Sequence, residues 1–326
     1  MRNLTGNRCR VVIGIDFSPP SMAAARWASR AVFPGAEFIL AHALVVPEIG
    51  GLLGGKYPLP ESLLANAHAG ALRRLRDASS ALGLPNARLE VREGRPSDAI
   101  AAIVRDLRAD IVVIGKHGEG GAHRGYAGHT ADQLVRSSPA SILVTNGPLQ
   151  DAPETIIVPL TWSSITSHII DRARLIADAT EARVVALHVI GSAVLSHVLS
   201  MAGVRHNEPV TADQIDEMFK EDADRWKNQL VSAGIPAARI TSDVVFGEVS
   251  SSVLGAAKEH GAGLIVMGSH AGPLRRILLG SAASAVLRDS DIPVLVVVEP
   301  DKVVASGVVA DLEISRDRES GPVYTI

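Results

Sequence analysis

Residues 115–130 read GKHGEGGAHRGYAGHT, and this stretch decides the fold. Six glycines fall between Gly115 and Gly128, after the apolar run 111–114 and before a helical pattern at 130–136. Glycines let backbone N–H groups approach an anion, and the start of a helix presents further N–H groups. A strand, a Gly-rich loop and a helix in this order therefore predict a phosphate-binding loop in an α/β fold.

The loop matches neither of two common phosphate-binding motifs. It lacks the Gly-Lys-Ser/Thr ending of a P-loop. It also comes late in its half of the chain, whereas the dinucleotide-binding fingerprint opens the first strand-to-helix turn. The loop sequence alone therefore predicts an anion site without naming the ligand.

Length and composition narrow the class of protein. A chain of 326 residues suggests about two domains of ~150 residues. The net charge of -3 gives no basic field, which excludes nucleic-acid binding driven by charge. A single cysteine, Cys9, excludes an internal disulfide and a thiolate metal cluster. The N-terminus has no apolar signal core, and no apolar run approaches the ~20 residues of a membrane span. We therefore expect a cytoplasmic protein that binds neither nucleic acid nor membrane.

The chain also repeats itself. Residues 11–16 resemble residues 156–161 at an offset of 145, and residues 110–115 resemble residues 263–268 at an offset of 153. The offset changes mainly in loops, as expected of a duplicated domain. The sequence therefore predicts two domains, residues 1–148 (repeat 1) and residues 153–300 (repeat 2), followed by a polar tail, residues 301–326.

Each repeat is predicted to alternate strands and helices, which favours a parallel sheet covered on both faces. The predicted strands are 11–16, 37–44, 87–93, 110–115 and 141–145 in repeat 1, and 155–160, 183–190, 239–246, 263–268 and 293–298 in repeat 2. The predicted helices are 19–32, 60–82, 97–108 and 129–137, then 163–179, 211–233, 250–260 and 280–289. Residues 47–60 and 191–210 are predicted to be loops.

These features resemble the universal stress protein family. In that family the fourth strand is followed by Gly, two residues, Gly, nine residues, Gly, and then Ser or Thr. Gly115, Gly118 and Gly128 keep this spacing, and Asp16 matches the Asp that ends the family's first strand. The likeness covers nearly all of both repeats. It implies two five-stranded, parallel-sheet α/β domains of the Rossmann-like, adenine nucleotide alpha hydrolase-like type. It also implies that the last strands pair across the repeats, which would pack about a pseudo-twofold axis.

The resemblance further implies that ATP binds mainly in repeat 1, with Mg²⁺ carried on its phosphates. Asp16 would accept a hydrogen bond from the adenine amino group. The rest of the implied site is Gly14, Ala43 and Ile114 along the base and ribose, Gly115 and Gly118 around the phosphates, and Gly128, His129 and Thr130 at the next helix start. His129 stands where the family has Ser or Thr, so either its ring or Thr130 would take over that contact.

Repeat 2 departs further from the family pattern. Gly268, Gly280 and Ser281 keep the first glycine and the ending of the loop, but the loop is one residue shorter. Thr161 replaces the adenine-reading Asp, and Ala271 occupies the position of the second glycine. We therefore expect a weaker or altered nucleotide site in repeat 2.

Several residues allow a structural interpretation beside the functional one. Asp16 can cap a helix or form an Asx turn together with Ser18. Lys116 can pair with phosphates or be a solvated loop charge. The loop histidines His117, His123 and His129 have no established metal-ligand geometry, so we expect no transition-metal site.

No catalytic constellation stands out, so we expect no dedicated enzyme and at most slow ATP hydrolysis. The leading hypothesis is an ATP-binding stress-response protein with a regulatory role that forms a homodimer. The alternative is a nucleotide-free scaffold that acts through protein contacts or binds another small ligand.

Overall fold

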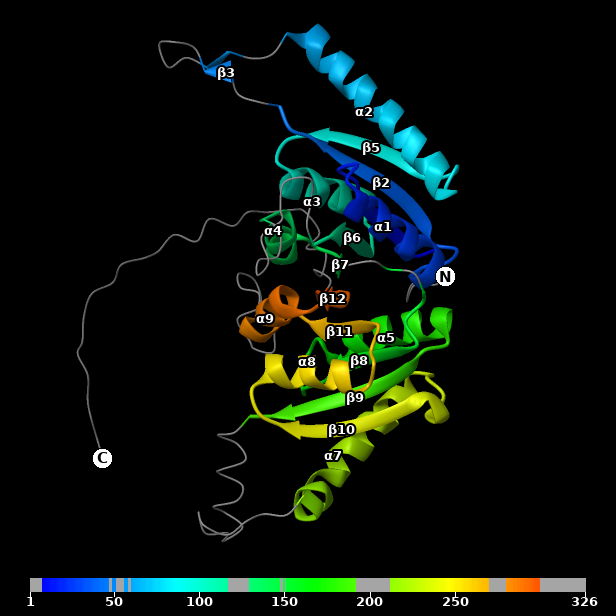
Figure 1. Cartoon of the computed structure of the whole chain (residues 1–326), viewed down its shortest axis with the longest axis vertical. Coiled ribbons are helices and arrows are strands. Elements are labelled where there is room, and N and C mark those ends of the chain that lie inside the picture. Colours follow the sequence, from blue (N-terminus) through cyan, green and yellow to red (C-terminus); the bar gives the residue numbers. More distant parts are fainter. Residues whose placement is uncertain are drawn as a thin grey trace, which may run out of the picture.

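The computed structural model describes residues 8–46, 49–50, 56–57, 60–116, 129–146, 149, 151–191, 212–269 and 280–299. Within these ranges the two repeats form successive α/β units that share one sheet (Figure 1). The predicted strands and helices are confirmed, with boundaries that agree to within about three residues.

Repeat 1 contains the first seven strands. Its elements are β1 (Arg10–Gly14), α1 (Pro19–Trp27), the π-helical turn η1 (Ala28–Val32), β2 (Glu37–Leu44), β3 (Ile49–Gly50), β4 (Lys56–Tyr57), α2 (Glu61–Leu82), β5 (Arg88–Glu93), α3 (Pro96–Leu107), β6 (Ile111–Gly115), α4 (His129–Ser137) and β7 (Ser141–Thr145). The segment predicted as a loop, residues 47–60, thus carries the small antiparallel pair β3–β4.

Repeat 2 follows the same order. Its elements are β8 (Thr155–Pro159), α5 (Thr166–Thr180), β9 (Arg183–Ile190), α7 (Ala212–Ser232), the 3₁₀ turn η2 (Ala237–Arg239), β10 (Ile240–Phe246), α8 (Val249–Glu259), β11 (Leu264–Gly268), α9 (Ser281–Asp289) and β12 (Val294–Val297). The predicted loop 191–210 and the tail 301–326 lie outside the described residues, apart from Gly191.

The main sheet has ten strands in the order β10-β9-β8-β11-β12-β7-β6-β1-β2-β5. Pairing is parallel within each repeat, whereas β12 and β7 are antiparallel, with Leu295 opposite Leu143. Read outward from this central pair, both halves show the same order of strands, so a pseudo-twofold axis passes between β7 and β12. The predicted pairing of the last strands is confirmed, and it covers an apolar edge that would otherwise be exposed.

The twist of the sheet decides where the strand ends lie. Neighbouring strands rotate by about 20–25° relative to one another. Although the two halves run in opposite directions where they meet, β5, β9 and β10 all point to the same side of the molecule (Figure 1). The carboxyl ends of the outer strands of both repeats therefore face one common side.

The core consists of two apolar layers, one on each face of the sheet. Successive strand residues alternate between them, so Val11 and Ile13 belong to one layer and Val12 to the other. Helices α1, α2, α5 and α7 cover the first layer, and α3, α4, α8 and α9 cover the second. This two-sided cover explains why the central strands are almost entirely apolar.

Polar contacts also cross between the repeats. Lys116 is only 6% exposed, and its Nζ donates to the carbonyl oxygens of Arg288 at 2.8 Å and Ser290 at 3.0 Å. Neither sequence interpretation of Lys116 described this arrangement, because the ammonium group is neither solvated nor free for a phosphate. At the opposite end of β6, Arg172 lies 3.9 Å from Asp110, with both side chains largely buried.

Cys9 is fully buried at the start of repeat 1, and burial, reinforced by the charge of Asp110, raises the pKa of its thiol to about 12. We predict that the native protein does not react with a thiol-specific disulfide reagent at mildly alkaline pH, because the nucleophile is the thiolate. The protein unfolded in guanidinium should react at its single cysteine. Absorbance of the released thiol measures both rates, and fast labelling of the native protein would contradict the burial of Cys9.

Candidate functional site

The strand order places a topological switch point in each repeat. In repeat 2 the chain moves from β8 outward through β9 and β10, and then returns to the other side of β8 to form β11 and β12. Ligands of open α/β sheets bind at such a switch point, beyond the carboxyl ends of the strands. The relevant strands are therefore β8 and β11 in repeat 2, and β1 and β6 in repeat 1.

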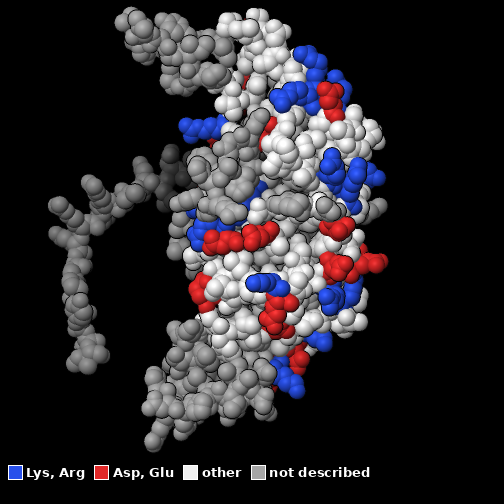
Figure 2. All heavy atoms as spheres, viewed as in Figure 1, with Lys and Arg blue, Asp and Glu red and all other residues white. Residues whose placement is uncertain are grey.

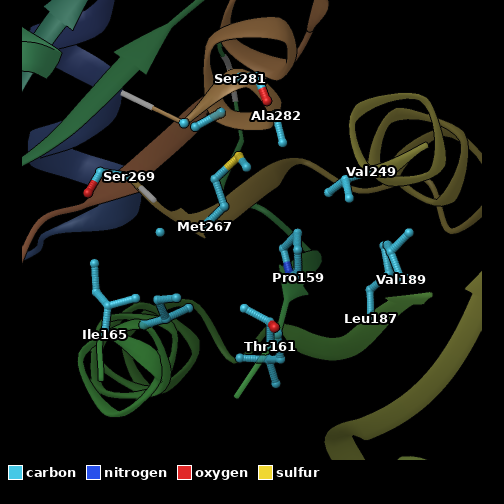
Figure 3. A pocket seen from close by; sticks show the side chains of 15 residues that line it. Pro159, Thr161, Ile165, Leu187, Val189, Val249, Met267, Ser269, Ser281 and Ala282 are labelled. Carbon is cyan, nitrogen blue, oxygen red and sulfur yellow. The ribbon is translucent and has the colours of Figure 1, made fainter. Parts of the chain in front are cut away.

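A cavity of about 360 Å³ lies at the switch point of repeat 2 (Figure 3). It is bounded by the ends of β8, β9 and β11 and by the starts of α8 and α9, and most of its surface is apolar. The lining residues are Pro159, Leu160, Thr161, Ile165, Ile169, Leu187, Val189, Val249, Met267, Gly268, Ser269, Gly280, Ser281, Ala282 and Ala283. Its volume lies within the ~300–1,000 Å³ typical of small-molecule sites.

One wall of the cavity is the N-terminus of α9. Gly280 is the N-cap residue and supplies no side-chain cap, and the first turn contains no acidic residue. The N–H groups of Ser281, Ala282 and Ala283 precede the first intrahelical bond, which Ser284 donates to the carbonyl of Gly280. The positive end of the helix dipole therefore faces the cavity, in the arrangement that binds anions.

The residues proposed from the sequence of repeat 2 meet at this cavity. Gly268 ends β11, Gly280 caps α9 and Ser281 begins it, and all three line the wall. The backbone N–H of Gly280 donates to the carbonyl of Ser269 at 2.7 Å, which ties the start of α9 to the end of β11. Thr161 also lines the cavity, at the position that Asp16 occupies in repeat 1.

The remaining wall residues were not singled out from the sequence, although the internal repeat contains a signal for four of them, Pro159, Val189, Met267 and Ala282. Eight of the nine residues implied for repeat 1 have a repeat 2 counterpart on the cavity wall. These counterparts are Pro159, Thr161, Val189, Met267, Gly268, Gly280, Ser281 and Ala282. Extending the repeat offset from the strands to the site would have found the apolar members of this set.

Repeat 1 brings those of its implied residues that the structure describes to the equivalent strand and helix ends. Gly14 ends β1 beside Ile114 on β6, and Ala43 lies near the end of β2. A Cβ on Gly14 would lie 3.1 Å from side-chain atoms of both Ile100 and Ile114, so close packing favours glycine there. Gly115 ends β6, and His129 and Thr130 begin α4. Gly118, Gly128, His117 and His123 lie outside the described residues.

Asp16 follows β1 and is half-buried. Its Oδ1 accepts hydrogen bonds from the backbone N–H of Ser18 at 2.9 Å and from the Ser18 hydroxyl at 2.5 Å. Ser18 is the N-cap of α1 and accepts from the backbone N–H of Ser21. The structural interpretation of Asp16 is confirmed, and these bonds hold its carboxylate at the switch point of repeat 1.

The turn that contains Asp16 is fixed by an aromatic contact. Phe17 adopts a left-handed backbone conformation with φ of 68°, which is costly for a bulky residue. Its ring packs 4.6 Å from the His42 ring, and the Arg74 guanidinium lies 3.9 Å above it. His42 Nδ1 lies 2.7 Å from the carbonyl oxygen of Ile15, so this histidine has a structural role in the turn.

Repeat 2 reproduces this support with different side chains. Trp162 stacks on Trp226 with the ring centroids 4.0 Å apart, and His188 Nδ1 lies 2.9 Å from the carbonyl oxygen of Leu160. Trp226 is fully buried, whereas Trp162 remains 54% exposed next to Thr161. The two repeats therefore share the contact of a histidine ring with the carbonyl before the turn, and each adds a different aromatic contact.

Glu248 caps the helix that carries Val249 into the cavity wall. Its carboxylate accepts from the Ser250 hydroxyl at 2.6 Å and from the Ser251 backbone N–H at 2.8 Å. These hydrogen bonds lower the pKa of Glu248 from 4.5 to about 2. A lowered carboxyl pKa stabilises the folded state above the unfolded value, and this stabilisation is lost as the pH falls through the folded value.

We therefore predict that Glu248→Gln lowers the free energy of unfolding at neutral pH, and that the difference from wild type shrinks as the pH falls from 4.5 to about 2. Urea denaturation across this range measures the difference. Glu259→Gln, at the other end of α8, is the control and should not destabilise the protein, because an acidic group is unfavourable near a helix C-terminus. A Glu248→Gln difference that did not depend on pH would contradict the capping role.

Three further observations concern the described part of the chain. No group of three or more His, Cys, Asp or Glu residues among the described positions could hold a metal ion. Over the same positions, no helix is both long and apolar enough to cross a bilayer. On the face drawn in Figure 2, acidic and basic side chains lie interspersed.

Comparisons with known proteins agree with this architecture. The sequence model of the Universal stress protein family matches residues 8–146 and again residues 153–298. Universal stress protein G of Shigella flexneri is 38% identical over 112 residues, which cover 34% of this chain and 74% of that protein. A universal stress protein of Mycolicibacterium smegmatis is 25% identical over 303 residues, 88% of this chain and 96% of that protein. The crystal structure of a universal stress protein from Archaeoglobus fulgidus has the same fold, with a TM-score of 0.62, 16% identity, and coverage of 90% of this chain and 97% of that one.

Proposed function

The chain belongs to the universal stress protein family, and from this premise we propose that it binds ATP with Mg²⁺ at its switch points and has a regulatory role in a stress response. The observation that carries the proposal is the cavity of about 360 Å³ at the switch point of repeat 2, with the start of α9 in its wall. The cavity offers apolar surface that suits a base and backbone N–H donors that suit an anion, and a nucleotide contains both a base and anionic phosphates.

The cavity wall suggests how the nucleotide would lie. Leu187, Val189 and Met267 offer apolar surface for the base, and the first N–H groups of α9, which make no intrahelical hydrogen bond, suit the phosphates. Mg²⁺ usually keeps several waters and binds through phosphates with few protein ligands. The lack of an acidic cluster among the described residues is therefore compatible with a metal carried by the nucleotide.

Repeat 1 is the site that the sequence favours for ATP, and we retain it in the proposal. Asp16 follows β1, which ends at Gly14, and the neighbouring strand β6 ends with Ile114 and Gly115, so these residues occupy the position equivalent to the cavity in repeat 2. A carboxylate can accept a hydrogen bond from an adenine amino group, whereas Thr161 in repeat 2 offers a hydroxyl. The proposal therefore gives repeat 1 the greater selectivity for adenine.

Isothermal titration of the full chain with Mg-ATP tests the proposal. We expect binding at submillimolar nucleotide, and no heat at millimolar nucleotide would overturn it. Trp162 lies half-exposed beside Thr161, so its fluorescence should change when repeat 2 is occupied. Trp162→Phe is the matched control that removes this signal while leaving the heat of binding.

A second candidate is a scaffold that binds a different small ligand in the same cavity. Two observations favour it: the wall of the cavity is largely apolar, and Thr161 stands where repeat 1 has the carboxylate of Asp16. Mass spectrometry of small molecules released from the purified protein by heat separates the two candidates. Release of an adenine nucleotide supports the leading proposal, and release of an apolar ligand supports the second.

The homodimer predicted from the sequence also remains a proposal. Its interface would have to lie away from the last strands, because β7 and β12 already pair within one chain. Light scattering coupled to size-exclusion chromatography measures the mass directly, and a monomer across the accessible concentration range would contradict the dimer.

A further inference from the structure

Lys116 is a buried cation held by the other repeat. It follows β6 in repeat 1, and its Nζ donates to the carbonyl oxygens of Arg288 and Ser290 at the end of α9 in repeat 2. A buried ammonium group must be hydrogen-bonded to be tolerated, and the end of a helix attracts cations. Burial nevertheless lowers the pKa of Lys116, against the opposing effect of the nearby Asp291 and Asp289.

The same helix end receives a second bond from repeat 1. Asn146 follows β7, and its Nδ2 donates to the carbonyl oxygen of Ser290 at 3.0 Å. Ser290 is itself only 2% exposed. The C-terminal end of α9 is therefore anchored by two side chains that belong to the other repeat.

The opposite end of α9 forms the cavity wall. The helix has nine residues, so its ends are about 14 Å apart, and its backbone hydrogen bonds link the positions of the two ends. Its N-terminus is tied to β11 by the bond from the backbone N–H of Gly280 to the carbonyl of Ser269. A shift of the end held by Lys116 must then change the direction or the depth at which the first N–H groups of the helix enter the cavity.

This anchor is built in one direction. The repeat offset places Ser269 at the position that corresponds to Lys116, and this short, uncharged side chain lies in the wall of the cavity. Repeat 1 thus supplies a cationic anchor to repeat 2, whereas the corresponding position of repeat 2 carries no cationic side chain.

We infer that Lys116 is a positioning residue for the cavity in repeat 2: by holding the end of α9, it aims the N–H groups of that helix at the anionic part of the ligand. This inference rests on the proposed function, and it makes the phosphate-binding half of the repeat 2 site depend on repeat 1. The apolar half of the same cavity, formed by β8, β9 and β11, does not depend on the anchor.

Two ligands with the same base, one with phosphates and one without, test the phosphate-binding half and the apolar half of the cavity separately. We propose titrating the full chain, labelled with ¹³C at the methionine methyl groups, with Mg-ATP and with adenosine, which lacks phosphates. Met267 lines the cavity, so its methyl resonance reports on repeat 2 alone. For Lys116→Met we expect adenosine affinity within about twofold of wild type and Mg-ATP affinity reduced about tenfold, as for a coupling carried by one contact.

The control variants distinguish a loss of the position of α9 from a general destabilisation of the fold. Lys116→Arg keeps a cation that can reach both carbonyls and should restore much of the preference for Mg-ATP over adenosine. Arg172→Met removes a different contact between the repeats and should leave that preference unchanged. If Lys116→Met does not fold, as judged by circular dichroism, Lys116→Gln keeps one donor without the charge and should show a smaller loss of the same kind.

The possible outcomes are distinct. Equal losses for both ligands in Lys116→Met, or no loss for either, would overturn the role of Lys116 while leaving the proposed function intact. A wild-type protein whose Met267 signal responds to neither ligand would overturn nucleotide binding in repeat 2, and the role of Lys116 with it.

Discussion

Replacing Ser281 with Asp is expected to abolish binding of Mg-ATP in repeat 2 without loss of stability. Ser281 is the first residue of α9 and lines the cavity. A carboxylate in the first turn favours the helix by about 0.3–1 kcal/mol. The same charge repels phosphate, and juxtaposed like charges cost several kcal/mol, which corresponds to a loss of more than about 100-fold.

The two effects have opposite signs, so they can be measured in one protein. Titration monitored at the Met267 methyl group gives the affinity, and thermal unfolding gives the stability. Ser281→Asn is the matched control, because it has the same size without the charge and should keep most of the affinity. If Ser281→Asp bound Mg-ATP as wild type does, the start of α9 would not be the phosphate end of the site.

Replacing Leu295 with Glu is expected to cause the largest loss of stability. Leu295 on β12 faces Leu143 on β7, and both side chains are fully buried at the centre of the ten-stranded sheet. A carboxylate there would be desolvated, and no cation lies within the central pair to compensate. We expect the free energy of unfolding to fall by more than about 4 kcal/mol, which only the most damaging substitutions reach.

Urea denaturation of two control variants separates the cost of the buried charge from the cost of a cavity and from the effect of the charge alone. Leu295→Ala creates a cavity and should cost about 2–5 kcal/mol. Thr241→Glu places the same charge at an exposed position on the outer strand β10 and should stay within about 0.5 kcal/mol of wild type. If Leu295→Glu were as stable as Thr241→Glu, the central strand pair could not exist in solution as described.

Local patterns explain why much of the fold was predictable. Apolar runs such as Ile111–Gly115 are long enough for a strand and too short for a helix, and the repeat fixes their order twice. Gly268, Gly280 and Ser281 were found from the spacing of the loop, and the structure brings all three to one cavity. In these cases residues that are close in sequence determine the element or the part of the site that they form.

Contacts between the repeats were not predictable in this way. Lys116 follows a strand and precedes a Gly-rich stretch, so its local sequence predicts a solvent or phosphate contact. Its actual partners are 172 and 174 residues away, and only the antiparallel meeting of β7 and β12 brings them near. The pairing of Arg172 with Asp110 has the same origin, since no local pattern marks either residue as a partner of the other.

The covalent link across the pseudo-twofold axis frees the interface from strict symmetry. When two identical subunits meet on a twofold axis, every substitution appears twice, so a residue that suits one side must also suit the other. Here the corresponding positions differ: Lys116 corresponds to Ser269, Trp27 to Arg172, and Asp110 to Gly263. After a gene duplication, each half of such an interface can therefore change separately. A side chain of one half can then hold an element of the other half in position.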